Sequence, residues 1–205
     1  MRMHMVLIRI TFVLIFVTAL FALSAAAAPV PFSNPRMRPY SGIGVLLVQI
    51  ENRDDEKLSI PFALYEEPAV SRFGSRGLGD FPRHEWIFGK NNLVAPLFVM
   101  ARKGEWVRIV FDDAGREAWL DMPDYSAFMP WEDFLKGRQI RMLPGLQKKY
   151  YQAFKRPGSA TAYQIQRHAM KVIRVDGDWA MVISGLNSLH WIRWRDEDGR
   201  MLVAV

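Results

Sequence analysis

The chain contains an internal repeat, and this repeat limits the possible folds more than any other feature of the sequence. Residues 104–109 (Gly-Glu-Trp-Val-Arg-Ile) correspond to residues 177–182 (Gly-Asp-Trp-Ala-Met-Val), 73 positions later. Residues 119–120 (Trp-Leu) correspond to residues 191–192 (Trp-Ile) at a spacing of 72. Two copies of one small unit explain both spacings. We therefore expect two small cores within the 205 residues rather than one large core.

In each copy, small aliphatic side chains alternate with larger side chains after the repeated glycine. In an extended strand, Val107 and Ile109 would face one side, and Trp106 and Arg108 would face the other. The corresponding residues of the second copy are Ala180 and Val182 on the first face, and Trp179 and Met181 on the second. We predict that the smaller aliphatic side chains face the core.

Short β-prone runs follow one another along most of the chain. The expected strands are residues 43–50, 59–65, 93–101, 106–111, 118–120, 138–143, 150–154, 170–175, 179–183, 191–193 and 201–205. Turn sequences such as Asp176-Gly177 separate them. Only residues 130–135 resemble a helical turn, because a proline is followed by early acidic residues. The expected fold class is all-β, as small barrels or a sandwich.

The repeated motif resembles the bacterial SH3-like (SH3b) domain family. It reads Gly-acid-Trp-x-x-aliphatic, then a polar hairpin and Trp-aliphatic. The resemblance covers roughly residues 59–125 and 147–195, and it implies two tandem small SH3-like β-barrels. Ala118 and His190 occupy positions where the family usually has a glycine before the second Trp. Residues 73–93 form a longer insertion than a compact module needs, either a functional loop over the barrel or an elaborated turn.

The N-terminal residues have the pattern of a secretory signal peptide. Its parts are arginines at positions 2 and 9, an uncharged stretch at 10–23 and small residues at 24–28. The uncharged stretch is shorter than the roughly 20 residues that a membrane-spanning helix needs. We expect a cleaved signal helix, with the cut after Ala26 or Ala27. The alternative is an uncleaved anchor, because residues 5–8 extend the apolar run beyond the second arginine.

The protein is accordingly expected to be periplasmic or otherwise exported, with membrane contact only through an uncleaved signal. Its expected organisation is a signal peptide at 1–27, a proline-rich tether at 28–42, the first SH3-like domain with its long insertion at 43–135 and the second at 136–205. Four prolines between residues 29 and 39 disfavour regular structure in the tether, so folded sequence is expected to begin near Ile43.

The two copies differ in charge. Residues 29–135 contain 12 Lys and Arg against 16 Asp and Glu, a net charge of −4, whereas residues 136–205 contain 13 against 5, a net charge of +8. Seven of the basic residues lie between 136 and 156, with no acidic residue among them. This stretch is either a solvated linker and strand or a contact surface for an anionic polymer, lipid headgroups or an acidic partner. Nucleic acid is not an expected partner of an exported protein.

The sequence also excludes several kinds of catalysis. It contains no Cys, which removes thiol nucleophiles, disulfides and Cys-based metal sites. His84, His168 and His190 lack a metal-binding spacing, and we interpret them as structural. Glu66 and Glu67 are adjacent in an expected strand and so point to opposite faces, which does not suit a general acid and base. We therefore expect no enzymatic activity, no metal and no cofactor.

The resemblance implies a non-catalytic module that recognises peptidoglycan or another polymer of the cell envelope. The alternative is a protein–protein interaction or assembly subunit in the periplasm, so the expected partner is a cell-wall polymer or an envelope protein. The candidate ligand-binding residues are Tyr65, Trp106 and Tyr125 in the first copy, and Tyr150, Tyr151, Trp179, Lys148 and Lys149 in the second. Aromatic side chains give contact area at low entropic cost, and the lysines would meet carboxylates of wall peptide stems.

A competing interpretation assigns these aromatic side chains to packing in the core or at the rim of a small barrel. We assign Trp119 and Trp191 mainly to the core for the same reason.

Overall fold

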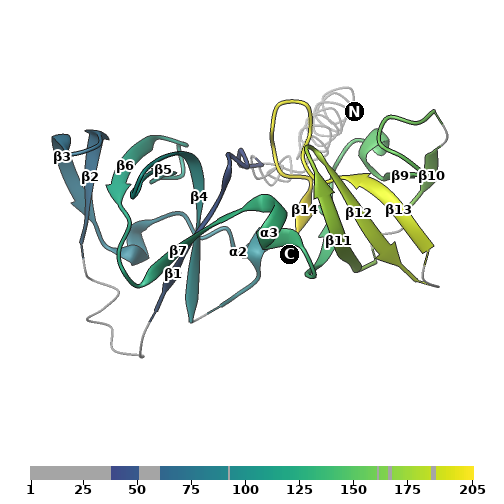
Figure 1. Cartoon of the computed structure of the whole chain (residues 1–205), viewed down its shortest axis with the longest axis horizontal. Helices are drawn as coiled ribbons and strands as arrows, with labels where there is room; N and C mark the ends of the chain where they lie inside the picture. The colour runs from purple at the N-terminus through teal and green to yellow at the C-terminus, as the bar shows by residue number, and fades with distance from the viewer. Residues whose placement is uncertain (1–37, 51–60, 92, 161, 166–167, 186–187) are drawn as a thin grey trace, which may run out of the picture. The chain divides into compact units, whose positions relative to one another are not determined.

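The computed structural model describes residues 38–50, 61–91, 93–160, 162–165, 168–185 and 188–205. They form one compact unit, Arg38–Val205. The expected signal peptide at 1–27 lies outside the described residues, as does the expected tether up to residue 37. Most of the regular structure of the unit is β-strand, arranged in two antiparallel sheets (Figure 1). This confirms the all-β prediction.

The first sheet has seven strands in the order β3-β2-β6-β5-β4-β1-β7. The strands are β1 (Gly44–Gln49), β2 (Phe62–Glu67), β3 (Val70–Arg76), β4 (Val94–Lys103), β5 (Trp106–Val110), β6 (Glu117–Asp121) and β7 (Ser126–Pro130). The apolar strand β1 lies between β4 and β7, where Leu46 is paired with Leu97 on one side and Phe128 on the other.

The second sheet has the order β10-β9-β13-β12-β11-β8-β14, so each strand takes the place of the strand seven earlier in the chain. Its strands are β8 (Gln139–Met142), β9 (Gln152–Phe154), β10 (Ala162–Gln164), β11 (Met170–Asp176), β12 (Trp179–Ser184), β13 (Ser188–Arg193) and β14 (Val203–Ala204). The hairpin registers agree as well, because Val107 is opposite Leu120 and Ala180 is opposite Ile192. The sequence repeat is therefore also a repeat of strand order and register.

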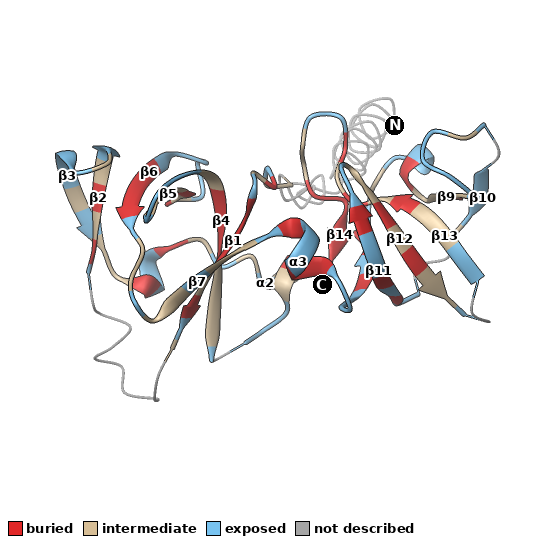
Figure 2. Cartoon of the chain, in the orientation of Figure 1, coloured by how far each residue is buried: buried red, intermediate tan, exposed pale blue. Residues whose placement is uncertain are grey.

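The strand faces follow the predicted alternation. Val107, Ile109, Ala180 and Val182 are all fully buried. Trp106 and Trp179, on the opposite face, are only partly buried. Figure 2 shows this contrast along the sheets, where buried and exposed residues alternate on several strands. Trp119 is buried, as expected, whereas Trp191 is only partly buried.

Two hydrophobic clusters hold the unit together. One lies within the first sheet and includes Leu64, Val99 and Leu120. The other joins Val45 and Phe98 of the first copy with side chains of the second, among them Met170 and Trp194. The short helix α3 (Trp131–Leu135), at the place predicted for a helical turn, contributes to this second cluster. The two copies thus share part of one core.

Three strands were not predicted: β3, β7 and β10. The insertion at 73–93 contains the end of β3, the 3-10 turn η2 (Leu78–Asp80) and the short helix α2 (Glu85–Phe88). Leu78, Phe81 and Ile87 are buried, so the insertion supplies core side chains. The backbone N–H of Val205 donates to the carbonyl of Ile87 at 2.6 Å. Of the two interpretations, these contacts support an elaborated structural connection.

The compact unit begins at Arg38, five residues before the expected start of the fold. The backbone N–H of Ser41 donates to the carbonyl of Gly199, and that of Met201 donates to the carbonyl of Pro39. Tyr40 and Arg200 form an isolated antiparallel bridge. Residues 38–42 are therefore bound to the second copy, which the proline content of the expected tether did not indicate.

Candidate ligand-binding pocket

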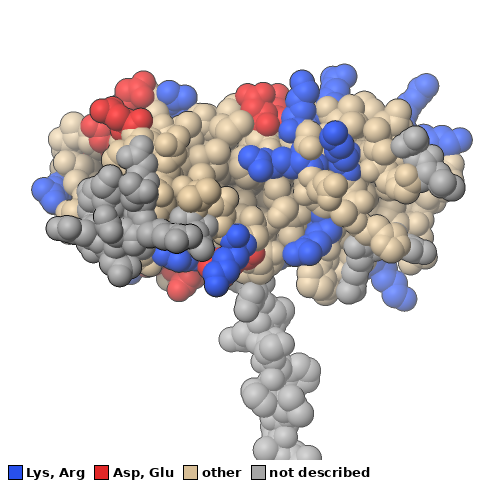
Figure 3. Space-filling model, turned by 90° about the horizontal axis from the view of Figure 1, so that it is seen from below, with Lys and Arg blue, Asp and Glu red and all other residues tan. Residues whose placement is uncertain are grey.

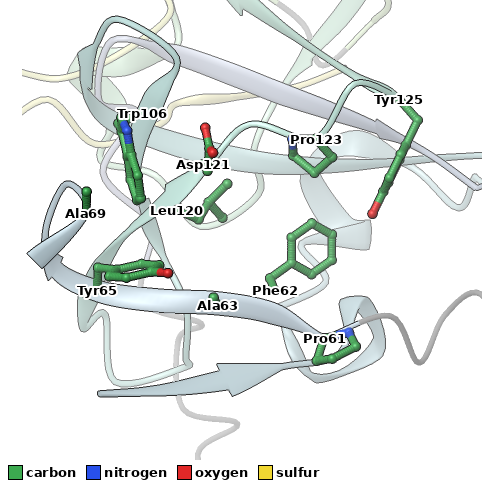
Figure 4. A pocket seen from close by; sticks show the side chains of 10 residues that line it. All are labelled: Pro61, Phe62, Ala63, Tyr65, Ala69, Trp106, Leu120, Asp121, Pro123 and Tyr125. Carbon is green, nitrogen blue, oxygen red and sulfur yellow. The ribbon is translucent and has the colours of Figure 1, made fainter. Parts of the chain in front are cut away.

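A pocket of about 430 Å³ lies between strand β2 and the β5–β6 hairpin of the first sheet. Strands β2, β5 and β6 and the loop after β6 build its walls, which are mainly aromatic, proline and small apolar side chains with one carboxylate. Figure 4 shows the ten lining residues: Pro61, Phe62, Ala63, Tyr65, Ala69, Trp106, Leu120, Asp121, Pro123 and Tyr125. All three aromatic residues predicted for the first copy, Tyr65, Trp106 and Tyr125, are among them.

Two rings form one end of the pocket. The centroids of the Tyr65 and Trp106 rings lie 5.1 Å apart, with an angle of 89° between the planes. An edge-to-face pair of this kind is a favourable aromatic contact, which holds both rings in place. Strand alternation explains why Trp106 faces outward, because its neighbour Val107, and Ile109 two residues further along β5, turn into the core.

Asp121 brings a negative charge to the same place. It is directly opposite Trp106 in the β5–β6 ladder, and its side chain faces the pocket (Figure 4). The residue is exposed. Within the part of the chain that the structure describes, no Lys or Arg forms an ion pair with Asp121. The carboxylate is therefore available to a ligand.

Tyr125 adds a neutral polar group to the wall. Burial raises the pKa of its hydroxyl above the ordinary value for tyrosine. The group therefore stays protonated at neutral pH and can donate or accept a hydrogen bond.

The turn beside the pocket has an unusual backbone. Ala69, which lines the pocket, has φ of 61°, and Ser71 has φ of 55°. These are the two non-glycine residues with positive φ in the described part of the chain. This region is sparsely populated by residues with a side chain, and such strain often accompanies binding sites. The strained backbone at Ala69 supports the choice of this pocket as the candidate site.

The second copy has an equivalent aromatic pair. Phe154 and Trp179 lie 5.2 Å apart between ring centroids at an angle of 89°, which matches the pair in the first copy. Phe154 is opposite Trp191 in its ladder, just as Tyr65 is opposite Trp119. Phe154 is thus the counterpart of Tyr65, although it is not among the binding residues predicted from the sequence.

The other candidate residues of the second copy lie around the 3-10 turn η3 (Lys148–Tyr150). Tyr150 is 8% exposed, and its hydroxyl donates to Glu197 Oε2 at 3.0 Å. The hydroxyl of Tyr151 donates to the carbonyl of Leu143 at 2.6 Å. Both tyrosines therefore make contacts within the fold, as in the packing interpretation. Their role in ligand binding stays a prediction.

Lys148 and Lys149 are exposed on the same turn. The ammonium of Lys149 lies 4.7 Å from the centroid of the Tyr150 ring and 3.8 Å from Glu197 Oε2. On the face shown in Figure 3, most Lys and Arg side chains lie over the half that holds the second sheet. This agrees with the positive charge calculated for that copy.

The histidines of the described residues show no arrangement for metal binding. No group of three or more His, Asp or Glu side chains in the described ranges is placed to hold a metal ion. His84 packs edge-on against Phe98, with 5.0 Å between ring centroids. Burial lowers its pKa, although the charge of Asp113 acts in the opposite direction. A histidine kept neutral in this way fits a structural role.

None of the helices among the described residues is long and apolar enough to cross a membrane. Comparisons with family models, with curated proteins and with solved structures found no match for this chain.

Proposed function

We propose that the protein is a non-catalytic binding module of the bacterial cell envelope, exported by the signal peptide at 1–27. We further propose that its two copies, 43–135 and 136–205, are SH3-like barrels. The sequence resemblance supports this assignment, as do the common strand order of the two sheets and the edge-to-face aromatic pair in each of them. Under this proposal, the role is recognition and involves no chemical step.

The observation that carries the proposal is the pocket between Tyr65, Trp106 and Tyr125. Rigid rings, a neutral hydroxyl and one carboxylate provide apolar area together with a few polar groups, which is the usual composition of a ligand site. Peptidoglycan is the first ligand to test, because the SH3b resemblance favours it and its peptide stems present both apolar and charged groups. Lys148 and Lys149 would contact stem carboxylates on the second copy.

Co-sedimentation with isolated peptidoglycan sacculi tests this ligand. We expect the purified protein to pellet with sacculi, and we expect Trp106→Ala and Tyr65→Ala to reduce the pelleted fraction. Leu93→Ala is a control, because Leu93 is exposed in the first copy and does not line the pocket. If the unchanged protein stays in the supernatant, peptidoglycan is not the ligand.

A protein partner is the second candidate, and the edge of the first sheet favours it. Among the strands that the structure describes, β3 is the outermost of the first sheet, so no described strand pairs with one of its sides. Two of its apolar residues, Val70 and Phe73, have 59% and 48% of their surface exposed. The turn between β2 and β3 borders the pocket, because Ala69 lines it. An extended peptide could pair with such an edge. A salt-dependent pull-down from envelope extract tests this role, and recovery of no partner at any salt concentration would contradict it.

A further inference from the structure

The two copies place different charges at one equivalent position. In the first hairpin Trp106 is opposite Asp121, and in the second hairpin Trp179 is opposite Arg193. The aromatic partners also correspond, because Tyr65 and Phe154 make the same edge-to-face contact with these tryptophans. The side chain beside the aromatic pair is thus a carboxylate in one copy and a guanidinium in the other.

In the second copy, the guanidinium of Arg193 lies over the Trp179 ring of the aromatic pair. The central carbon of the Arg193 guanidinium lies 4.9 Å from the centroid of the Trp179 ring. Its Nη1 lies 3.0 Å from Glu197 Oε1. A cation over the face of Trp, balanced by a carboxylate, is a favourable arrangement. The second copy therefore contains, within its own chain, the kind of group that this aromatic pair accommodates.

In the first copy the corresponding cation is missing from the described residues. None of the Lys and Arg side chains placed there lies over the Trp106 ring. The nearest arginine on the strand, Arg108, is held elsewhere, because it lies over Trp119 and its Nε is 3.0 Å from Glu117 Oε2. What the first copy has instead is an open pocket with the Asp121 carboxylate beside the rings.

We propose that this pocket binds the guanidinium of an arginine side chain presented by a polypeptide partner. Trp106 would take the place of Trp179 beneath the cation, and Asp121 would supply the carboxylate that Glu197 supplies in the second copy. The net charge of −4 on residues 29–135 also favours a cationic partner. The proposal rests on the binding role proposed above for this pocket, and it names the ligand chemistry. If an arginine side chain binds in this pocket, the ligand is a segment of a protein rather than a wall polymer.

Titration with short peptides tests the proposal directly. The probes are N-acetyl-Ala-Arg-Ala-amide, the same peptide with neutral citrulline in place of arginine, and the same peptide with lysine. The readout is the NMR signal of the Trp106 indole N–H, assigned by its loss in Trp106→Phe. We expect the arginine peptide to shift this signal with an affinity at least about fivefold higher than that of the citrulline peptide, because only arginine gains the cation–π and ion-pair contacts.

The comparison of the two copies suggests which substitutions at Asp121 test the proposal. Asp121→Arg copies the arrangement of the second copy, so its own guanidinium is expected to cover Trp106 and abolish binding. Asp121→Asn is expected to lower the affinity for the arginine peptide toward that for the citrulline peptide, because it removes the ion pair and leaves the cation–π contact with Trp106. Asp124→Asn is the matched control, because Asp124 is an exposed carboxylate nearby that does not line the pocket. Asp121 is exposed, so these changes should leave the thermal unfolding temperature unchanged, which is checked in parallel.

The outcomes separate this proposal from peptidoglycan binding. Equal shifts with the arginine and citrulline peptides, or undiminished binding by Asp121→Arg, would overturn it. A second pair of results would also overturn it: the arginine peptide causes no response, and sacculus binding is lost when the free amines of the wall are acetylated. These results would assign the pocket to wall amines. Failure of sacculus binding alone, with a normal response to the arginine peptide, would contradict only the peptidoglycan assignment.

Discussion

Arg38 Nη2 lies 2.7 Å from Asp196 Oδ2, and this ion pair joins residues 158 positions apart in the sequence. Asp196 is buried, with 3% of its surface exposed. Its other oxygen accepts hydrogen bonds from the backbone N–H groups of Asp198 and Arg200. One carboxylate thus fixes the 196–200 turn and also binds the start of the compact unit to the second copy.

We predict that Asp196→Asn lowers the free energy of unfolding by about 1–3 kcal/mol. The single amide oxygen cannot accept from both the turn and the guanidinium, so the partly buried charge of Arg38 is left with a weaker partner. Chemical denaturation measures the loss. Asp198→Asn is the control, since Asp198 is exposed and lies in the same turn. Equal stability of the two variants would show that the carboxylate is unimportant for the fold.

The same carboxylate predicts a dependence of stability on pH. Burial raises the pKa of Asp196, but the backbone N–H of Arg200 and the charge of Arg38 outweigh it and hold the pKa below its ordinary value. A pKa lowered by folding stabilises the protein above the unfolded value of about 4, and this contribution is lost as the pH falls below it.

The stability difference between the unchanged protein and Asp196→Asn should therefore be constant from about pH 5 to 7 and should shrink between about pH 4 and 2. Denaturation curves recorded at several pH values give this difference. A difference that grows on acidification would have the wrong sign for a carboxylate stabilised in its charged form.

Some of these contacts could be predicted from the sequence, and others could not. The Trp106 hairpin was predictable, because strand alternation and the repeat are local patterns. The contact of Tyr65 with Trp106 follows once both strands are placed in one sheet. The role of Asp121 depends on register, because only the ladder shows that it is opposite Trp106 and that Arg193 takes its place in the second copy.

Other features depend on contacts that no local pattern encodes. Arg38 binds Asp196 across most of the chain, so a proline-rich segment gave no sign of it. Tyr150 and Tyr151 were expected in a strand, yet Tyr150 ends a 3-10 turn and both hydroxyls bond within the fold. Strand β3 was missed because its residues, including Gly74, are mostly exposed and lack an apolar alternation.

The two faces of strand β5 should respond differently to truncation. Ile109→Ala should cost about 2–5 kcal/mol of unfolding free energy, because Ile109 is fully buried in the first cluster. Trp106→Ala should cost only about 1–2 kcal/mol, since its ring is partly exposed at the pocket. Denaturation gives both values. A larger loss for Trp106→Ala would assign this ring mainly to packing and would weaken the case for the pocket as a binding site.

The shared cluster predicts that the two copies unfold together. Trp131 packs against Phe98 of the first copy and Trp194 of the second, with ring centroids 5.8 Å and 5.3 Å away. Its indole N–H also donates to the buried carbonyl of Ser41 at 2.7 Å. Trp131→Ala should therefore cost about 3–5 kcal/mol, and the unchanged protein should unfold in one calorimetric transition. Two separate transitions in the unchanged protein, only one of which moves in Trp131→Ala, would mean that the shared cluster does not couple the copies.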